Sequence, residues 1–508
     1  MNTQSVPPGH PQSSESSLTL HAFRYLCSRW LLAIVTSALL VVPCYWHRRI
    51  EAGDLPSHTY NAWLAHLIGQ GQAPGLYIVP QWNNALLDLA LLHLGNAVGF
   101  ITAEKIVAAV CVLVFFWGTF AFIAAATQRA PWFLVSAIAM IAYGYTFYMG
   151  FLNYYLSLGL GFFAVALFWR GTRWDWIGGA VLVVFTFLAH PMGLACLLGT
   201  AAYVLLAEKL HGIYRWLLFA SAFPAVYGAH AFISRRYRSF TWHDKTDFFT
   251  MNGADQLSLF GPRYIKLEWT VFIMGCLIFL LGVWLKRNTN TSWKIFRAPL
   301  ELWAALVFAA LVFPEIIFLP QYGEGSVFGF VVSRLTTVTA VFGLCVLGSI
   351  ELNKWHFLVL SAFAIVFFVF QYQDTAALNR MEQQAERLVA PLPYGHRVMQ
   401  TMWPGDDSRI WFIGHMAERA CIGKCFLYSN YEAGTLQFRI RALPGNPIVT
   451  PSSKDSLHME QGRYTVRPED LPISQIYQCD EADLTKLCIR DLVAGEVNGR
   501  LGHLPPKF

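Results

Sequence analysis

Charged residues are scarce in this sequence. Lys, Arg, Asp and Glu make up 13% of the 508 residues, whereas 55% of the residues are hydrophobic. A soluble core cannot hide that much apolar surface, so the composition excludes an ordinary soluble protein and indicates that the lipid bilayer is the solvent. The formal net charge of +6 forms no basic stripe suited to DNA, and we expect no nucleic-acid partner.

Several familiar motifs are also missing. The sequence contains no P-loop, no dinucleotide-binding glycine fingerprint and no HExxH motif. Nucleotide-driven transport and zinc-dependent proteolysis therefore have no support. We find no internal repeat either, although inverted repeats are typical of many transporters.

The first two thirds of the chain, residues 26–371, consists of apolar runs that short polar clusters separate. A membrane-spanning helix needs roughly 20 mostly apolar residues, and by that measure we predict an α-helical polytopic membrane protein with about eleven spans. The predicted spans are residues 30–46, 106–126, 132–149, 152–169, 177–189, 192–207, 216–232, 269–285, 300–319, 327–350 and 357–370.

Residues 372–508 lack such runs. They combine a helical pattern at 374–388, a short apolar run at 409–413 and a stretch rich in Gly and Pro at 443–448. This mixture favours a small soluble domain of the α/β or α+β type.

Basic residues beside the spans predict the topology. Residues 1–25 are polar, rich in Pro and Ser, and without the basic flank of a signal peptide, so we expect a disordered cytoplasmic tail. An odd number of spans then puts residues 372–508 outside the cytoplasm. The basic residues that fall on the cytoplasmic side are Arg24, Arg29, Arg129, Arg170, Arg173, Lys209, Arg215, Lys286, Arg287, Lys294, Arg297 and Lys354.

One basic cluster lies on the opposite side in this topology. Arg235, Arg236 and Arg238 follow the seventh predicted span, in a longer loop that also contains acidic residues. We interpret this loop as a possible surface for an anionic ligand. The acidic residues are Asp244, Asp247 and Asp255.

The segment 47–105 is too long for a tight connection and carries two helical patterns, so we predict an ordered extracytoplasmic unit. The first helix begins with Asp54 as N-cap and Pro56 in the first turn. The second, at residues 84–94, is expected to lie at the membrane interface. Alternatively, residues 84–100 form a short span, which would reverse the topology after it.

Four cysteines lie in the C-terminal part, namely Cys421, Cys425, Cys479 and Cys488. An even number fits two disulfides in an oxidising compartment, although the number alone does not fix the pairing. A zinc site made of the four thiolates is the alternative.

Two carboxylates and an imidazole lie close together directly after the first span, in Glu51-Ala-Gly-Asp54 and His58. If Asp54 caps the helix, His58 lies one turn further on and near the same face. The two side chains could then share a proton or a metal ion. The alternative is that Asp54 only caps the helix and that His58 only bonds a neighbouring loop.

A carboxylate in a long first extracytoplasmic loop, followed by a helix and many spans, resembles the GT-C superfamily of polyprenyl-phosphate-dependent glycosyltransferases. Glu51-Ala-Gly-Asp54 stands where many members have an Asp-X-Asp or Asp-Glu pair. Three further runs are similar to those of uncharacterised bacterial relatives. They are Gly150-Phe-Leu-Asn153-Tyr-Tyr-Leu-Ser-Leu-Gly159, Ala189-His190-Pro-Met-Gly193 and Ser333-Arg334-Leu.

The resemblance implies a bacterial inner-membrane enzyme that transfers a sugar from a polyprenyl-phosphate donor to an extracytoplasmic glycan, lipid or protein. Asp54 would be the general base, with Glu51 as a second catalytic carboxylate. Arg334 would bind the phosphate, because an intramembrane arginine is costly unless it meets an anion or a cavity. Arg235 and Arg236, with Arg238, are the next candidates for phosphate. Members differ in metal dependence, so a divalent ion such as Mg or Mn, held by Asp54 and His58, stays open.

Other polar residues are candidates for binding substrate. His58, His190 and Glu324 could contact it, Glu324 from a loop flanked by glycines, where it could equally be part of a turn. Asn153 and Glu315 could line the cavity. Interhelical hydrogen bonds are the alternative role for Asn153, His190 and Glu315.

Two other functional classes remain open. A transporter or flippase for a lipid-linked sugar or polymer also needs many spans and buried polar groups. A non-catalytic scaffold of an envelope polysaccharide machine would use residues 372–508 for docking. The long ordered first loop favours the enzyme, because a transporter does not need it.

Overall fold

The computed structural model describes residues 30–241, 251–285, 290–322, 326–403, 408–480 and 482–499. The predicted tail at residues 1–25 lies outside this part of the chain, as does Glu324. Within it, each of the eleven predicted spans falls on helix. These helices are α2 (Trp30–Tyr45), α5 (Phe100–Thr127), the pair α6 (Val135–Ala142) and α7 (Tyr145–Tyr148), α8 (Leu152–Arg170), α9 (Arg173–Ala189), α10 (Pro191–Lys209), α11 (Gly212–Arg236), α13 (Pro262–Leu285), α14 (Asn290–Val312), α15 (Val331–Gly348) and α16 (Lys354–Val389).

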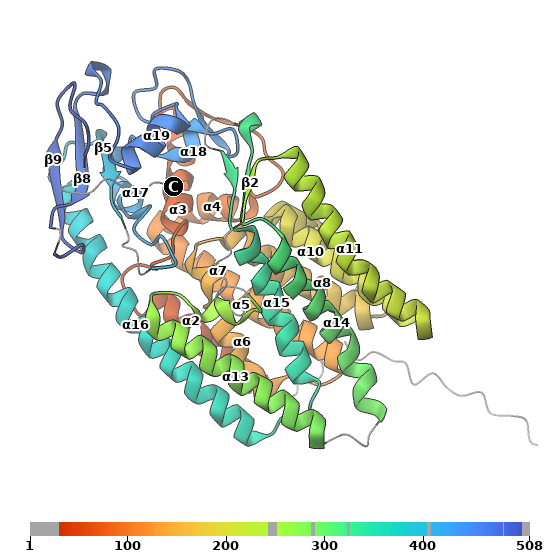
Figure 1. The fold of residues 1–508 in the computed structure, drawn as a ribbon. Coiled ribbons are helices and arrows are strands. Elements are labelled where there is room, and N and C mark those ends of the chain that lie inside the picture. The colour runs from red at the N-terminus through yellow and green to blue at the C-terminus, as the bar shows by residue number, and fades with distance from the viewer. Residues whose placement is uncertain are drawn as a thin grey trace, which may run out of the picture.

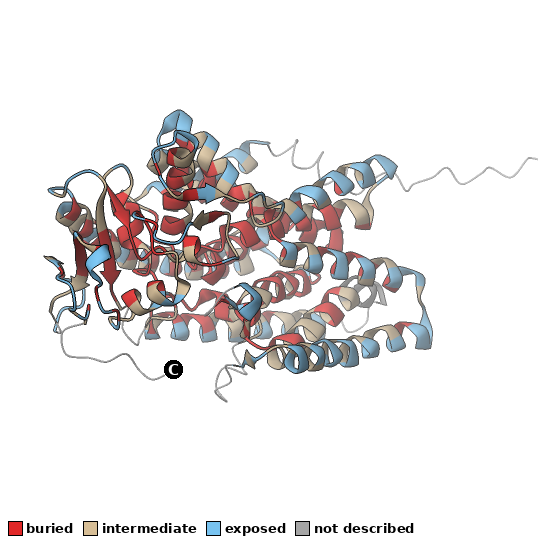
Figure 2. Cartoon of the chain, turned by 90° about the horizontal axis from the view of Figure 1, so that it is seen from above, coloured by how far each residue is buried: buried red, intermediate tan, exposed pale blue. Residues whose placement is uncertain are grey.

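The chain is a multi-pass membrane protein. In the described residues, seven helices are long and apolar enough to cross a membrane, namely α5, α8, α10, α11, α13, α15 and α16. Helix α2 and the stretch Trp132–Tyr148 are shorter apolar helices. Large apolar side chains such as Val184, Ile273 and Leu280 are exposed on the outer helix faces, where lipid would cover them (Figure 2).

The membrane helices form a bundle, and the soluble elements gather at one end of it (Figure 1). The C-terminal domain, α3 (Leu55–Gly69), α4 (Leu86–Val98) and β2 (Ser239–Phe240) lie together at that end. The basic connections lie at the opposite end, where Arg129 pairs with Glu351 across 3.5 Å. This arrangement agrees with the predicted positive-inside topology.

Two predicted spans extend beyond their helices. The prediction of a span at 300–319 is wrong at its end, because Pro314 cannot continue the helical hydrogen bonding and α14 ends at Val312. The next apolar residues form strand β3 (Ile316–Phe318). Likewise, residues 327–328 of the predicted span at 327–350 form β4 (Val327–Phe328). Strand β3 pairs antiparallel with β2 and β4, which satisfies this backbone without helix.

The first loop is ordered, as predicted. It contains α3, strand β1 (Leu76–Ile78) and α4. Helix α4 has 13 residues and ends at Gly99, whose φ of 84° lets the chain turn back into α5. A helix of that length reaches only about 20 Å, so residues 84–100 do not form a span.

The C-terminal domain is built on a mixed four-stranded sheet in the order β6-β5-β8-β9. Strands β5 and β6 and strands β5 and β8 are parallel, whereas β8 and β9 are antiparallel. The run 409–413 forms turns instead of a strand. The elements are β5 (His396–Thr401), α17 (Met416–Cys421), β6 (Cys425–Leu427), α18 (Tyr431–Gly434), β7 (Ile440–Ala442), α19 (Ser453–Glu460), β8 (Ile473–Gln478) and β9 (Leu487–Asp491).

Continuous structure joins this domain to the membrane part. The last predicted span and the helix predicted at 374–388 are one helix, α16. Strand β1 of the first loop pairs with β7 of the C-terminal domain. Trp63 of α3 stacks on Phe426 with 5.8 Å between ring centroids. The Tyr60 hydroxyl, also in α3, accepts a hydrogen bond from Leu427 N at 2.8 Å. The first loop and the C-terminal domain therefore pack as one extracytoplasmic layer.

Candidate functional site

Asp54 is fixed by the backbone that precedes α8. The amide nitrogens of Gly53 and Asp54 donate to the carbonyl oxygens of Tyr148 and Met149, at 2.7 and 2.9 Å. Gly150 has φ of +78°, and a Cβ on it would lie 2.4 Å from the Asp54 nitrogen. Only glycine allows this approach, which holds Asp54 at the outer end of the membrane helices.

The Asp54 side chain does not cap helix α3. Asp54 occupies the N-cap position of α3, as predicted, but its side chain makes no capping hydrogen bond. Pro56 supplies no backbone N–H in that first turn, which reduces the need for a cap. The carboxylate is 30% exposed. An aspartate at this position is therefore accessible to a substrate.

Arg334 lies in the first turn of α15 without an acidic partner within 4.0 Å among the described residues. Its guanidinium packs over the Phe151 ring, 4.1 Å from the centroid, and Nη1 donates to Gly329 O at 3.0 Å. Its Nε atom is buried and makes no hydrogen bond in the described part of the chain. A partly buried cation in this state is suited to an incoming anion.

Asp54 and Arg334 belong to one site. Gly150 contacts the Asp54 backbone, and the next residue, Phe151, lies against the Arg334 guanidinium. Among the described acids, Asp54 and, to a lesser extent, Glu315 lie near enough to attract the Arg334 guanidinium. The Tyr154 hydroxyl donates to Arg334 O at 2.8 Å. A carboxylate and an unpaired guanidinium thus face the same region at the membrane surface.

His415 was not predicted from the sequence. It belongs to the C-terminal domain, and its Nε2 lies 3.7 Å from Asp54 Oδ1. On the other side of the ring, Nδ1 lies 3.3 Å from Glu418 Oε1. No local motif marks this histidine, because its partner Asp54 is more than 300 positions away. The C-terminal domain therefore contributes a side chain to the Asp54 site.

His58 faces a different carboxylate from the one predicted. Its Nδ1 lies 2.9 Å from Asp88 Oδ1 in α4, and not against Asp54. Burial would lower the pKa of His58, but the charge and hydrogen bond of Asp88 outweigh burial and raise it to about 9. Beside this pair, a small hollow between α3, α4 and the C-terminal domain is lined by Asn61, Asp88, Glu432 and Arg439.

The side chains of Asp54 and His58 do not form the metal site that the sequence left open. Asp54 and His58 do not converge, since each has its own partner. The described residues contain no group of three or more His, Cys, Asp or Glu side chains that could hold a metal ion. We therefore assign no metal ligands and derive no step through a metal.

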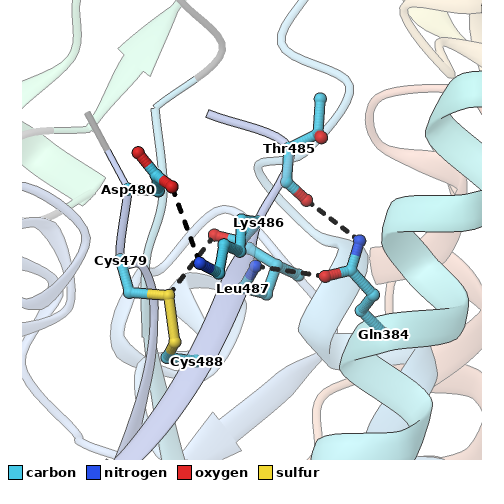
Figure 3. The surroundings of a disulfide bond; sticks show 7 residues. All are labelled: Gln384, Cys479, Asp480, Thr485, Lys486, Leu487 and Cys488. Carbon is cyan, nitrogen blue, oxygen red and sulfur yellow. Dashed lines mark hydrogen bonds and ion pairs between the residues drawn. A yellow bond between two sulfur atoms is a disulfide. The ribbon is translucent and has the colours of Figure 1, made fainter. Parts of the chain in front are cut away.

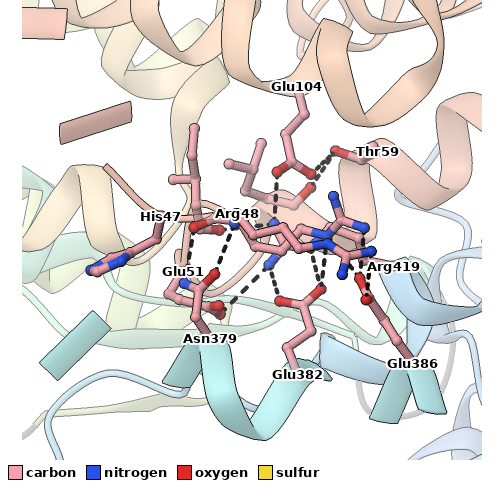
Figure 4. Close-up of polar contacts among 12 residues, drawn as sticks. His47, Arg48, Glu51, Thr59, Glu104, Asn379, Glu382, Glu386 and Arg419 are labelled. Atoms are coloured by element: carbon pink, nitrogen blue, oxygen red, sulfur yellow. Dashed lines mark hydrogen bonds and ion pairs between the residues drawn. The ribbon is translucent and has the colours of Figure 1, made fainter. Parts of the chain in front are cut away.

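Glu51 is part of a buried ion cluster and is 2% exposed (Figure 4). Its Oε2 lies 3.5 Å from Arg419 Nη2. Arg419 also contacts Glu382, and its Nη1 lies 2.7 Å from Glu104. Burial, followed by the charge of Glu382, raises the pKa of Glu51 well above its usual range. Glu51 is therefore buried against Arg419, whereas Asp54 lies against His415.

Three other candidates make structural hydrogen bonds around Arg334. Asn153 Oδ1 accepts from Leu87 N at 3.0 Å, and His190 Nδ1 accepts from Met192 N at 3.1 Å. Glu315 accepts from the first amides of α15 and from the Ser333 hydroxyl. The three sequence runs that carry the resemblance thus meet at one place. Whether any of these side chains also contacts a substrate stays a prediction.

The candidate arginines in the last turn of α11 and directly after it lie at the outer surface. Arg235, Arg236 and Arg238 are exposed, and the guanidinium of Arg238 lies 5.2 Å from the Phe318 ring centroid. Asp255, from the same loop, is buried and pairs with Arg409 at 3.3 Å. Asp255 is therefore part of the interior and not of an anion-binding surface, and Asp244 and Asp247 lie outside the described residues.

The four C-terminal cysteines form two disulfides, Cys421–Cys425 and Cys479–Cys488, the second of which Figure 3 shows. This confirms the predicted disulfides, and the alternative of a zinc site is wrong. Disulfides in this domain are consistent with an extracytoplasmic location. The first pair closes the loop directly after α17, which carries Arg419, and the second joins β8 and β9.

No protein-family model matches this sequence, and a search of curated proteins finds no match. The chain is thus defined by its own features, as a polytopic helical membrane protein with a small disulfide-containing C-terminal α/β domain.

Proposed function

We propose that this protein is a membrane glycosyltransferase that moves a sugar from a polyprenyl-phosphate-linked donor to an extracytoplasmic acceptor. The observation that carries the proposal is the accessible Asp54 carboxylate, which caps no helix and shares a region at the membrane surface with the unpaired Arg334. A base and a cation beside lipid are what transfer from a lipid phosphate requires.

The reaction is a displacement at the anomeric carbon of the sugar. The acceptor hydroxyl attacks this carbon while Asp54 removes the hydroxyl proton, and the bond between the carbon and the phosphate oxygen breaks. The lipid phosphate leaves with the bonding electrons. Arg334 binds the phosphate and stabilises the charge that grows on it, an interaction whose loss typically costs about 100- to 1,000-fold in rate.

The donor and the acceptor approach from different sides. The lipid tail of the donor stays in the bilayer, so that its phosphate meets Arg334 at the start of α15. The hollow lined by Asn61, Asp88, Glu432 and Arg439 lies one to two turns along α3 from Asp54, on the extracytoplasmic side. This hollow has room for about one water-sized group, so it could take a single hydroxyl of an acceptor and not a whole sugar ring.

The test is transfer of radiolabelled sugar from polyprenyl-phosphate donors to membrane lipids and glycans, compared between wild type and Asp54→Asn at matched expression. A general base contributes typically about 100- to 10,000-fold, so we expect the variant to lose nearly all transfer while keeping its thermal unfolding midpoint. Asp483→Asn is the matched control, because Asp483 is exposed in a C-terminal loop.

Undiminished transfer by Asp54→Asn would eliminate Asp54 as the base. If neither protein transfers any sugar from a panel of donors, the transporter and scaffold alternatives gain weight. A flippase would still move a fluorescent lipid-linked sugar across liposome membranes, whereas a scaffold would not.

A further inference from the structure

Helix α17 brings a histidine of the C-terminal domain to the Asp54 site. His415 occupies the N-cap position of this helix. Its Nε2 faces Asp54 Oδ1 at 3.7 Å, while Nδ1 faces Glu418 Oε1 at 3.3 Å. The imidazole also lies against the Tyr431 ring, with 5.3 Å between centroids. The ring is therefore held from three sides and connects two carboxylates.

The far end of α17 is anchored in the membrane part. Arg419 is fully buried, donates to Ile50 O at 2.8 Å, and pairs with Glu104 of α5 and Glu382 of α16. Ile50 lies four residues before Asp54 in the same loop. The contacts of Arg419 therefore fix α17 relative to the loop that carries Asp54, and the position of His415 follows from them.

Four acids from different elements interact electrostatically with His415. Asp54 comes from the loop before α3, Glu418 from α17, Glu432 from α18 and Glu460 from α19. Burial lowers the pKa of His415, but these charges and the Glu418 hydrogen bond outweigh burial and raise it to about 9. The ring is thus an imidazolium at neutral pH and becomes neutral as the pH rises through about 9.

We propose that His415 is a positioning residue of the glycosyl-transfer site, whose ring orients the Asp54 carboxylate, so that the site is complete only with the C-terminal domain docked. This inference rests on the proposed function. The distance of 3.7 Å is longer than a hydrogen bond, which leaves Asp54 able to accept a proton from the acceptor hydroxyl. Glu418, which is 1% exposed, holds the opposite side of the imidazole ring through the contact between its Oε1 atom and His415 Nδ1.

The first measurement is independent of activity. In full-length protein in detergent micelles, the ring 13Cε1–1H signal of His415 is identified as the one that disappears in His415→Gln. We expect it to titrate near pH 9 in wild type and at least about 0.5 unit lower in Asp54→Asn and in Glu418→Gln, because each substitution removes one nearby negative charge. Asp483→Asn should leave the midpoint unchanged.

The second measurement is the pH profile of transfer. Wild type should lose activity as the pH rises through about 9, where His415 loses its proton. His415→Gln should reduce transfer about 10- to 100-fold, as expected for a misplaced catalytic group, and should lack this alkaline limb. His415→Arg keeps a cation at all these pH values, so it should recover part of the activity and also lack the limb. A structural role alone would not move the limb.

Two results would overturn the inference, and they differ in what they leave standing. If Asp54→Asn abolishes transfer but does not change the His415 midpoint, His415 has no positioning role, whereas the proposed function stands. If Asp54→Asn shifts the midpoint but transfers sugar normally, Asp54 is not the base and the positioning role of His415 fails with it, whereas the proposed function itself fails only if wild type transfers no sugar from any donor. An alkaline limb that persists in His415→Gln would also contradict the positioning role.

Discussion

Arg419 of α17 lies with its Nη1 2.7 Å from Glu104 Oε1 near the start of α5, and both side chains are fully buried. A residue of the C-terminal domain thus neutralises a carboxylate at the outer end of a membrane helix. Because the same guanidinium pairs with Glu382 of α16 and contacts Glu51, one side chain joins three separate segments (Figure 4). The docking of the C-terminal domain is therefore electrostatic as well as apolar.

Replacing Arg419 with Met should destabilise the protein strongly. The substitution leaves buried carboxylates without their cation, and breaking a buried pair in this way typically costs about 3–5 kcal/mol. We expect a much lower thermal unfolding midpoint and less folded protein after detergent extraction, measured by intrinsic fluorescence and size-exclusion chromatography.

Arg48→Met is the control for Arg419→Met. Arg48 also pairs with an acid of this cluster, Glu386 at 3.0 Å, but its side chain is 59% exposed. An exposed pair contributes about 1 kcal/mol or less, so this variant should unfold close to the wild-type midpoint. Equal effects of the two substitutions would show that burial of the Arg419 cluster does not matter.

Arg334→Gln should reduce transfer about 100-fold while the protein stays folded. The substitution removes the cation that stabilises the leaving phosphate, and also removes a partly buried charge that has no acidic partner among the described residues and therefore has a cost in stability. The measurement is transfer rate as a function of donor concentration, together with the thermal midpoint.

The double variant Arg235→Gln/Arg236→Gln distinguishes the two predicted phosphate sites. Both arginines are exposed at the end of α11, away from the Arg334 packing against Phe151. We expect transfer within about threefold of wild type, because exposed charges affect mainly the encounter with the donor. A loss larger than that of Arg334→Gln would move the phosphate site to α11.

The membrane helices could be predicted from the sequence because lipid imposes a simple rule, a long apolar run with its backbone bonded internally. The span predicted at 152–169 and helix α8, Leu152–Arg170, agree almost to the residue. The rule fails where an apolar run is not helical. The apolar residues Ile316–Phe318 lie within the span predicted at 300–319, but after Pro314 they form strand β3, which pairs with β4.

Only the local part of the site could be predicted. Asp54 could be predicted because it directly precedes a helix start that contains a proline. Arg334 could be predicted because a charge in an apolar run is costly unless it has a function. His415 and Arg419 could not be predicted, because the pairing of Arg419 with Glu104 joins residues 315 positions apart and leaves no periodic pattern. Glu51 lies only three residues from Asp54, yet the turn between them directs the two carboxylates to different partners.

Glu51→Gln should keep transfer within about twofold of wild type and should flatten the pH dependence of stability. Because the pKa of Glu51 is raised in the folded state, this group favours folding fully below its ordinary pKa, and that contribution is lost as the pH rises through the folded-state pKa. Glutamine cannot ionise, so the thermal midpoint of the variant should fall less than that of wild type between pH 5 and 9.

A folded Glu51→Gln variant without activity would contradict this expectation and would return Glu51 to the catalytic role first predicted for it. Glu386→Gln, at the exposed edge of the same cluster, is the reference for substitutions that change charge there. Its pairing with Arg49 at 2.6 Å is partly accessible to solvent, so the wild-type pH dependence should persist in that variant.

The two disulfides should differ in their effect on transfer, although their effects on stability are similar. Closing loops with sequence separations of 4 and 9 residues contributes about 2–3 kcal/mol in each case by chain entropy. Cys421–Cys425 closes the end of α17, whose other end carries His415, whereas Cys479–Cys488 joins β8 and β9, which backbone pairing already holds together (Figure 3).

We therefore expect Cys421→Ala/Cys425→Ala to lose about tenfold in transfer at a temperature where both variants are folded, because a misplaced α17 misplaces His415. Cys479→Ala/Cys488→Ala should stay within about twofold of wild type, and an equal loss in both variants would mean that general stability, and not the position of α17, limits transfer.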